Sequence, residues 1–161
     1  MIRKMHASDG QRVLQIYRQG LETRNATFET EVPDWKHWDL AHHKFCRIVY
    51  AQKGKVLGWG ALAPLSKRSC YKGVAEISVY IDTGHLGQGI GSKLMKAVID
   101  ESEKNGIWTL YASIFPENVA SHKLHLLHGF REVGIRERIA QLDGIWRDTL
   151  ILERRSQKVG V

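Results

Sequence analysis

The stretch from Val74 to Asn105 constrains the fold more than any other part of the chain. In residues 74–81 every second side chain is apolar, at 75, 77, 79 and 81, and the side chains between them are of mixed polarity. This period of two is the pattern of a strand with one apolar face. Residues 82–91 are rich in glycine. Apolar residues then recur at helical spacing and stop before Asn105-Gly106, at Ile90, Leu94, Val98 and Ile99. The sequence therefore predicts a strand, a glycine-rich turn and an amphipathic helix in direct succession.

Such a turn favours an anionic ligand. Gly84, Gly87, Gly89 and Gly91 allow positive φ and leave room for a ligand beside the backbone. The first amides of the following helix have no internal partner, and the helix dipole adds to their attraction for phosphate. Two familiar phosphate motifs do not fit. A P-loop needs Lys after its last glycine, and the dinucleotide fingerprint needs glycine at its sixth position. A tight glycine turn with no ligand is the alternative.

The remaining pattern predicts a mixed sheet. Further strands are expected over 2–5, 47–51, 55–65, 107–114, 130–140 and 146–153. Further helices are expected from a cap at Ser8 to about Gly20, from Pro33-Asp34 through Leu40, and over 118–128. Runs of consecutive strands favour an α+β, three-layer fold. We expect a largely antiparallel central sheet of about seven strands, flanked by about four helices.

Length and composition indicate one globular domain over residues 1–161, with residues 155–161 as a frayed tail. No apolar run reaches the length of a membrane span, and the first residues do not resemble a signal peptide. The two cysteines, Cys46 and Cys70, lack metal-site spacing, so a reduced, cytoplasmic setting is expected. The net charge of +7 is scattered along the chain, which argues against a nucleic-acid-binding module and suits a ligand with several phosphates.

Three motifs together resemble the GNAT superfamily of acetyl-CoA-dependent N-acetyltransferases, and the resemblance covers nearly the whole chain. They are Val79-Tyr80-Ile81, then Gly87-Gln88-Gly89-Ile90-Gly91-Ser92, then Asn118, Ser121, His125 and Gly129-Phe130. Within the superfamily the chain most resembles the phosphinothricin and methionine sulfoximine acetyltransferases. That closer likeness depends on residues 27–31, on residues 75–81, and on Leu124-His125.

The resemblance implies acetyl-CoA as co-substrate. It implies that the backbone of Val79 and Ile81, on either side of Tyr80, pairs with the pantetheine arm like an added strand. It places the pyrophosphate on Gly87, Gln88, Gly89, Ile90, Gly91 and Ser92, and the far side of the cofactor on Asn118 and Ser121. Relatives usually have Gln or Arg where this chain has Leu86. Because the backbone amides make most of the phosphate contacts, cofactor binding is expected to survive, with a reduced affinity left open.

Acetyl transfer to an amine needs a base, because an α-amino group is mostly protonated at neutral pH. Glu76, on the strand that leads into the glycine turn, is the candidate, with a pKa raised by desolvation. His125 is the second candidate, as acid or base. A backbone amide near Val79 is expected to stabilise the oxyanion, and transfer is expected to be direct. His122, His125 and His128 do not share one helix face, so no metal is expected.

For the amine substrate, a small amino-acid analogue, the resemblance points to Phe28 and Glu29 in an early loop. Arg68 and Tyr71 are the candidates for its acidic head and for closing the pocket. Relatives are commonly dimers, so a homodimer is expected. Three alternatives stay open: an acetyltransferase for a polyamine, aminoglycoside or protein N-terminus; a CoA-binding protein without activity; and the nucleic-acid module.

Overall fold

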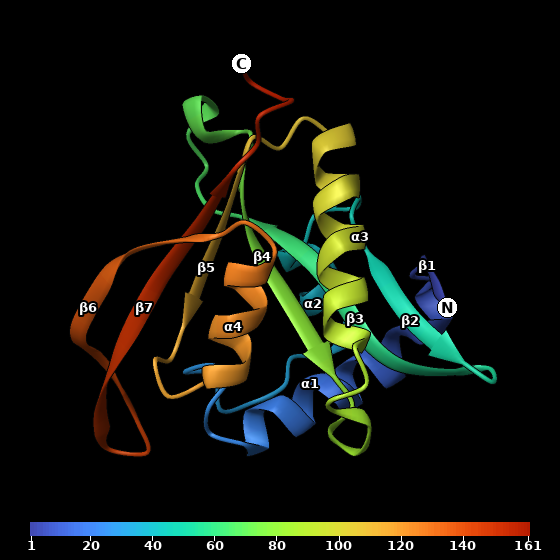
Figure 1. Cartoon of the computed structure of the whole chain (residues 1–161). Helices are drawn as coiled ribbons and strands as arrows, with labels where there is room; N and C mark the ends of the chain where they lie inside the picture. The colour runs from blue at the N-terminus through green and yellow to red at the C-terminus, as the bar shows by residue number, and fades with distance from the viewer.

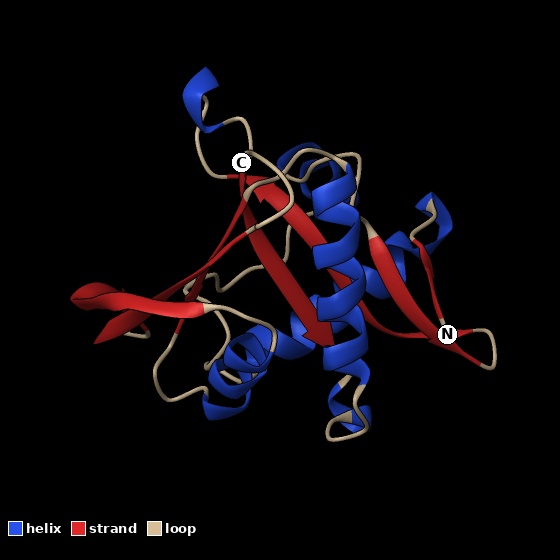
Figure 2. Cartoon of the chain, turned by 45° about the horizontal axis from the view of Figure 1, so that its top comes forward, coloured by secondary structure: helices blue, strands red, loops and turns tan.

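A computed structural model describes all residues from Met1 to Val161. One seven-stranded sheet, in the order β1-β2-β3-β4-β5-β7-β6, forms the middle layer (Figure 1). Helices cover both of its faces, as the view coloured by secondary structure shows (Figure 2). The fold is the mixed α+β arrangement of seven strands and four α-helices that the sequence predicts.

The elements follow the predicted order. The strands are β1 (Ile2–Lys4), β2 (Ile48–Gln52), β3 (Lys55–Pro64), β4 (Val74–Ile81), β5 (Thr109–Ile114), β6 (Arg131–Leu142) and β7 (Ile145–Arg155). The α-helices are α1 (Gly10–Glu22), α2 (Trp35–Ala41), α3 (Ile90–Lys104) and α4 (Val119–Leu127). Short 3-10 helices are η1 (Ala7–Asp9), η2 (Ser69–Tyr71) and η3 (Thr83–His85). None of the helices combines the length and the apolar composition that a membrane-spanning segment needs.

Each sheet face has its own apolar core. On the face under α3 and α4, Leu94, Met95 and Val98 of α3 are fully buried against the strands. On the opposite face, Val13 and Ile16 of α1 pack with strand residues and with Trp38 and Trp59. Trp38 and Trp59 are both fully enclosed in this core, each 1% exposed. Burial on both faces is what holds the central strands rigid beneath the site.

Two end effects differ from expectation. Ser8 does not cap the first helix: it lies inside η1, and the Asp9 side chain accepts from the His6 amide at its start. The C-terminal segment, expected to be a frayed tail from residue 155, is also partly held by the fold. Arg155 is the last residue of β7, and Ser156 is buried, with its amide donating to the Trp108 carbonyl at 2.7 Å. Charged residues at a chain end suggested fraying, but backbone pairing overrides that signal.

The strands β4 and β5 separate partway along the sheet. They are parallel neighbours at only three positions, from Val74 opposite Thr109 to Glu76 opposite Tyr111. Beyond that point β4 continues to Ile81 paired only with β3, while β5 continues paired only with β7. Figure 1 shows the two strands diverging towards α1. The β5-facing side of residues 78–81 therefore has no strand partner.

Candidate active site

The main cavity lies where β4 and β5 separate. Its volume is about 920 Å³, within the usual range for small-molecule sites. Its wall combines the free side of β4, the glycine turn, the start of α4 and the loop after α1. Among the sequence-predicted residues it is lined by Phe28, Glu29, Glu76, Val79, Tyr80, Ile81, Gly87, Gly89, Gly91, Ser92, Asn118, Ser121 and His125. Residues distant in sequence thus meet around one cavity.

The glycine turn has the backbone conformation that the sequence predicts. Gly87 and Gly89 have φ of 74° and 77°, and Gly89 is the N-cap of α3. A side chain at either position would meet nothing within 4 Å, so the left-handed backbone, not lack of space, requires glycine. The backbone amides at the start of α3 therefore lie at one end of the cavity and have no hydrogen-bond partner within the helix. Free amides of this kind can bind an anionic group.

A buried carboxylate fixes the entrance to this turn. Asp82, directly after β4, accepts hydrogen bonds from Arg12 and Gln19 of α1, from the Gly84 amide and from His85. Burial would raise the pKa of Asp82, but these hydrogen bonds outweigh it and hold the pKa well below its usual range. The network ties α1 to the turn, so the turn keeps one position relative to β4.

Glu76 lies at the point where the two strands part. Its carboxyl is half-buried, and burial raises its pKa. It forms no ion pair, in contrast to Asp82. Burial raises the pKa of Tyr17 to about 12, and the charges of Glu29 and then Glu76 add smaller contributions in the same direction. Glu76 is thus a desolvated carboxylate facing an open space, the condition under which a carboxylate accepts a proton most readily.

His125 faces the same cavity from α4. It is buried, and its Nδ1 lies 2.7 Å from the carbonyl oxygen of Ser121. A carbonyl only accepts, so Nδ1 carries the proton and Nε2 is left as the acceptor. Burial lowers the pKa of His125, and the neighbouring His122 and His128 lower it further. The neutral imidazole is favoured, which suits the role of base or acceptor better than that of acid.

The early loop forms the wall opposite β4. Phe28 packs edge-on against Phe115, with ring centroids 4.9 Å apart, and the Arg147 guanidinium lies 3.8 Å from the Phe115 centroid. Arg147 also donates to the Arg24 carbonyl at 2.6 Å. Asn118 caps α4 by accepting from the Ser121 amide, and its own amide donates to the Asn25 carbonyl. The loop is therefore attached to β7 and to the start of α4.

Four sequence-predicted residues do not line the cavity. Arg68 and Tyr71 lie in the segment between β3 and β4, which projects away from the sheet (Figure 1), and they contact each other, with Arg68 5.5 Å from the ring centroid. Residue type suggested a contact with an acidic group, but β3 carries the chain beyond the cavity before these residues occur. In the glycine turn, Ile90 is in the apolar core and Gln88 is exposed. Only the backbone amides of Gln88 and Ile90, and not their side chains, can therefore contribute to an anion site in the glycine turn.

Sequence reasoning missed several lining residues. Tyr17 of α1 and Trp59 of β3 form an aromatic wall together with the predicted Tyr80 of β4. The ring centroids are 6.1 Å apart for Tyr17 and Trp59, and 5.0 Å apart for Tyr80 and each of the other two. His42 and Thr149 also line the cavity. Their sequence signal is that of ordinary core positions, and only the tertiary structure places them around the cavity that Glu76 also lines.

The pattern that defines the "Acetyltransferase (GNAT) family" matches residues 11–130. This chain belongs to the GNAT acetyltransferase family. The YwnH protein of Bacillus subtilis (strain 168), whose provisional name is that of a phosphinothricin acetyltransferase, is 34% identical over 151 residues, 91% of this chain and 93% of that protein. The phosphinothricin N-acetyltransferase of Alcaligenes faecalis is 30% identical over 164 residues, 95% of this chain and 81% of that protein.

Solved GNAT structures share the fold. The structure of a ribosomal-protein-alanine N-acetyltransferase from Brucella melitensis aligns with a TM-score of 0.90 and 28% identity, over 97% of this chain and 99% of that one. A phosphinothricin acetyltransferase from Sinorhizobium meliloti, solved in complex with acetyl-CoA, aligns with a TM-score of 0.89 and 23% identity, over 99% and 90%. The first of these proteins is named for a protein substrate and the second for a small molecule, so the shared fold does not select the amine.

Proposed function

We propose that this GNAT enzyme transfers an acetyl group from acetyl-CoA directly to the α-amine of a small amino-acid analogue of the phosphinothricin or methionine sulfoximine type. The observation that carries the proposal is the parting of β4 and β5 at Glu76, with the glycine turn at one end of the opening. The overall identity with two phosphinothricin acetyltransferases supports the substrate class.

The residues fit acetyl-CoA. The free backbone of Val79 and Ile81 offers donors and acceptors to the amide groups of the pantetheine arm, in the manner of an added strand. The amides around Gly87 and Gly89 offer a site for its pyrophosphate. When bound, acetyl-CoA supplies an activated thioester. The Asn118 side chain, which accepts from the Ser121 backbone amide, holds the start of α4 in place beside it.

Glu76 and His125 take the protein's part in proton transfer. In this proposal the Glu76 carboxylate attracts the substrate ammonium into the cavity and accepts its proton, directly or through a water, so that the neutral amine can attack. Neutral His125 orients a polar group of the reactants through Nε2 and can accept a proton there. A backbone amide near Val79 would stabilise the developing oxyanion.

One observation favours a second candidate, an amine without an acidic head. The cavity is lined by two carboxylates, Glu29 and Glu76, and by no Lys or Arg side chain. Carboxylates attract cationic groups and repel a phosphinate or carboxylate, so a polyamine or aminoglycoside would also suit this wall. Arg147, behind Phe115, is a nearby cation that does not line the cavity.

The deciding experiment is release of CoA thiol from acetyl-CoA across a panel of amines. The amino-acid proposal expects the highest kcat/KM with phosphinothricin or methionine sulfoximine. Higher kcat/KM with polyamines or aminoglycosides would select the second candidate. Binding of acetyl-CoA without turnover of any amine would contradict both and leave a CoA-binding protein. We further propose that the protein is a cytoplasmic homodimer.

A further inference from the structure

His128, at the C-terminal end of α4, contacts the glycine turn although it has no part in the proposed proton transfer. Its Nε2 lies 2.7 Å from the hydroxyl oxygen of Ser92, in the first turn of α3. Figure 1 shows α4 beside that end of α3. Ser92 lines the cavity, whereas His128 does not. His128 can therefore act on a ligand at the glycine turn only through Ser92.

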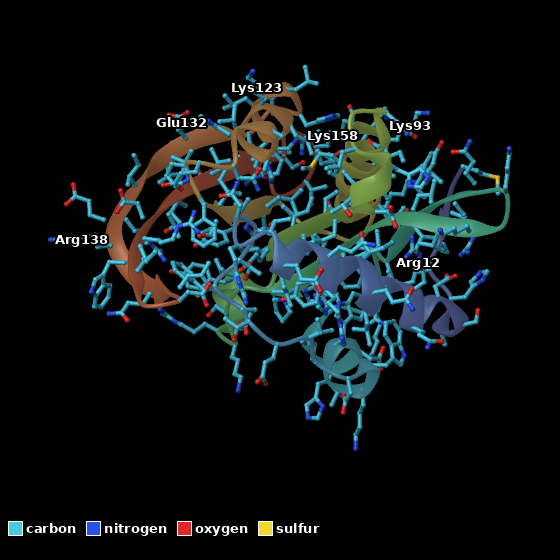
Figure 3. All side chains as sticks on the ribbon, turned by 90° about the horizontal axis from the view of Figure 1, so that it is seen from below. Arg12, Lys93, Lys123, Glu132, Arg138 and Lys158 are labelled. Atoms are coloured by element: carbon cyan, nitrogen blue, oxygen red, sulfur yellow. The ribbon has the colours of Figure 1, made fainter.

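The nearby lysines of the two helices face elsewhere. The ammonium of Lys93, the residue after Ser92, lies 5.5 Å from the ring centroid of Tyr50, on the β2 side of α3. Figure 3 shows Lys93 of α3 and Lys123 of α4 pointing outward from their helices, and both side chains are exposed. The imidazole of His128 is thus the side chain that bonds the Ser92 hydroxyl.

The direction of this hydrogen bond decides what Ser92 can do, because a serine hydroxyl has only one proton. If Nε2 of His128 is unprotonated, the hydroxyl donates to it and has no proton left for a ligand. If Nε2 carries a proton, it donates to the Ser92 oxygen, and the hydroxyl is free to donate to a second group. Nδ1 of His128 bonds no group of the protein, so the ring can carry its proton on either nitrogen, unlike that of His125.

We propose that His128 is a positioning residue for the cofactor: with a proton on Nε2, it orients the Ser92 hydroxyl so that this hydroxyl donates to the pyrophosphate at the glycine turn. Pyrophosphate oxygens are acceptors, so they select the ring with a proton on Nε2. A second proton, on Nδ1, makes the ring cationic and a stronger donor. The inference rests on the proposed binding of acetyl-CoA at this turn and is independent of the amine.

The charges around His128 make this role dependent on pH. Lys96 of α3 and Arg154 of β7 face the ring, and each is paired with an acidic residue of α3, Asp100 for the first and Glu103 for the second. Burial lowers the pKa of His128, and the two cations lower it further, so the ring is neutral at pH 7 in the free protein. A bound pyrophosphate favours the imidazolium and raises this pKa. The affinity is therefore highest below the pKa of the free protein and falls as pH rises through the pKa of the complex.

Binding of dephospho-CoA to the full chain, measured by calorimetry without an amine, tests the proposal. This probe keeps the pyrophosphate and lacks the 3′-phosphate, a group that itself gains a proton near pH 6. The wild-type Kd should fall about three- to tenfold from pH 8 to pH 6, the range expected for one charge-assisted hydrogen bond. His125, one turn earlier on α4, also titrates, so variants of His128 are needed to assign the effect.

Two substitutions separate the donor from its charge. His128→Gln keeps an N–H donor for Ser92 but does not titrate, so its Kd should stay within about twofold of the wild-type value at pH 8 and lose the pH dependence. His128→Leu has no donor and should bind about three- to tenfold more weakly than the wild type at pH 6.

A double-variant cycle separates a role in binding from a role in packing. In a Ser92→Ala background, His128→Leu should weaken binding no further, because its effect passes through the hydroxyl. His122→Gln is the matched control on the same helix: His122 bonds Glu132 and does not contact Ser92, so Kd and its pH dependence should be unchanged.

Three results would overturn the proposal: wild-type pH dependence in His128→Gln, wild-type affinity of His128→Leu at pH 6, or a further loss of affinity from His128→Leu in the Ser92→Ala background. Acetyl transfer is assayed separately. Absence of turnover with the expected binding results would overturn the proposed function and leave the role of His128 in place.

Discussion

The side-chain amide of Asn118 donates to the main-chain carbonyl of Asn25 at 3.1 Å, across 93 residues of sequence. This bond, with those from Arg147 to the same loop, attaches the wall that carries Phe28 to the rest of the site. The substrate side of the cavity is therefore held by residues that do not themselves need to touch the amine.

We predict that Arg147→Ala raises KM for the amine with little change in KM for acetyl-CoA. The loss of the bond to the Arg24 carbonyl and of the contact with Phe115 frees the loop, while the glycine turn is unaffected. Arg147→Lys should recover only part of the effect, because Lys lacks the planar fork that bonds several groups at once. Steady-state kinetics with each substrate varied in turn checks this. An equal rise in both KM values would mean general loss of structure instead.

Replacement of Glu76 should lower the rate of acetyl transfer. Glu76→Gln is expected to lower kcat about tenfold to a thousandfold, because the amide cannot accept a proton. Only the carboxylate form is active, so the wild-type rate falls as pH drops through the pKa of Glu76. That pKa is raised, so the fall begins at higher pH than for an ordinary glutamate. The acidic limb of the kcat/KM profile should disappear in the variant. An unchanged rate and profile would assign Glu76 to structure.

The order of helices and strands and the position of the glycine turn were predictable because each is encoded by a local sequence pattern. The alternation of residues 74–81 and the glycines up to Gly91 mark a strand and a turn whatever surrounds them. The position of Arg68 was not predictable, since a cation in a loop looks the same whether the loop covers a cavity or leaves it. The aromatic wall at Trp59 was missed for the converse reason: core and cavity positions on a strand share one pattern.

His125 can be separated from its neighbours on α4. His125→Ala should lower kcat about tenfold to a thousandfold if Nε2 takes part in proton transfer. The side chain is buried, so thermal unfolding must be followed as well, to correct for a loss of packing. His122→Ala is the control, because His122 lies near the surface, paired with Glu132, and does not line the cavity. Equal activity in the two variants would remove His125 from the mechanism.

A pair of glycine substitutions separates cofactor binding from stability. Gly89→Ala and Gly54→Ala both force alanine into positive φ, at 77° and 76°, with nothing within 4 Å of the new side chain. Each should cost about 1 kcal/mol of stability. Only Gly89 is in the glycine turn, so only Gly89→Ala should raise KM for acetyl-CoA, by about three- to tenfold if the strain moves the amides. Similar KM values in both variants would place the phosphates elsewhere.

Leu86 offers a test by gain of affinity. It lines the cavity at the entrance of the glycine turn, is 60% exposed, and stands where the resemblance to the family predicts Gln or Arg. Leu86→Arg should lower KM for acetyl-CoA about two- to fivefold, because an exposed ion pair contributes up to about 1 kcal/mol. The gain should shrink as salt is added, since exposed charges are screened. Leu86→Gln, which adds hydrogen bonding without charge, should give a smaller gain that salt does not change. If neither variant alters KM, residue 86 lies beyond reach of the phosphates, and the backbone amides alone hold them.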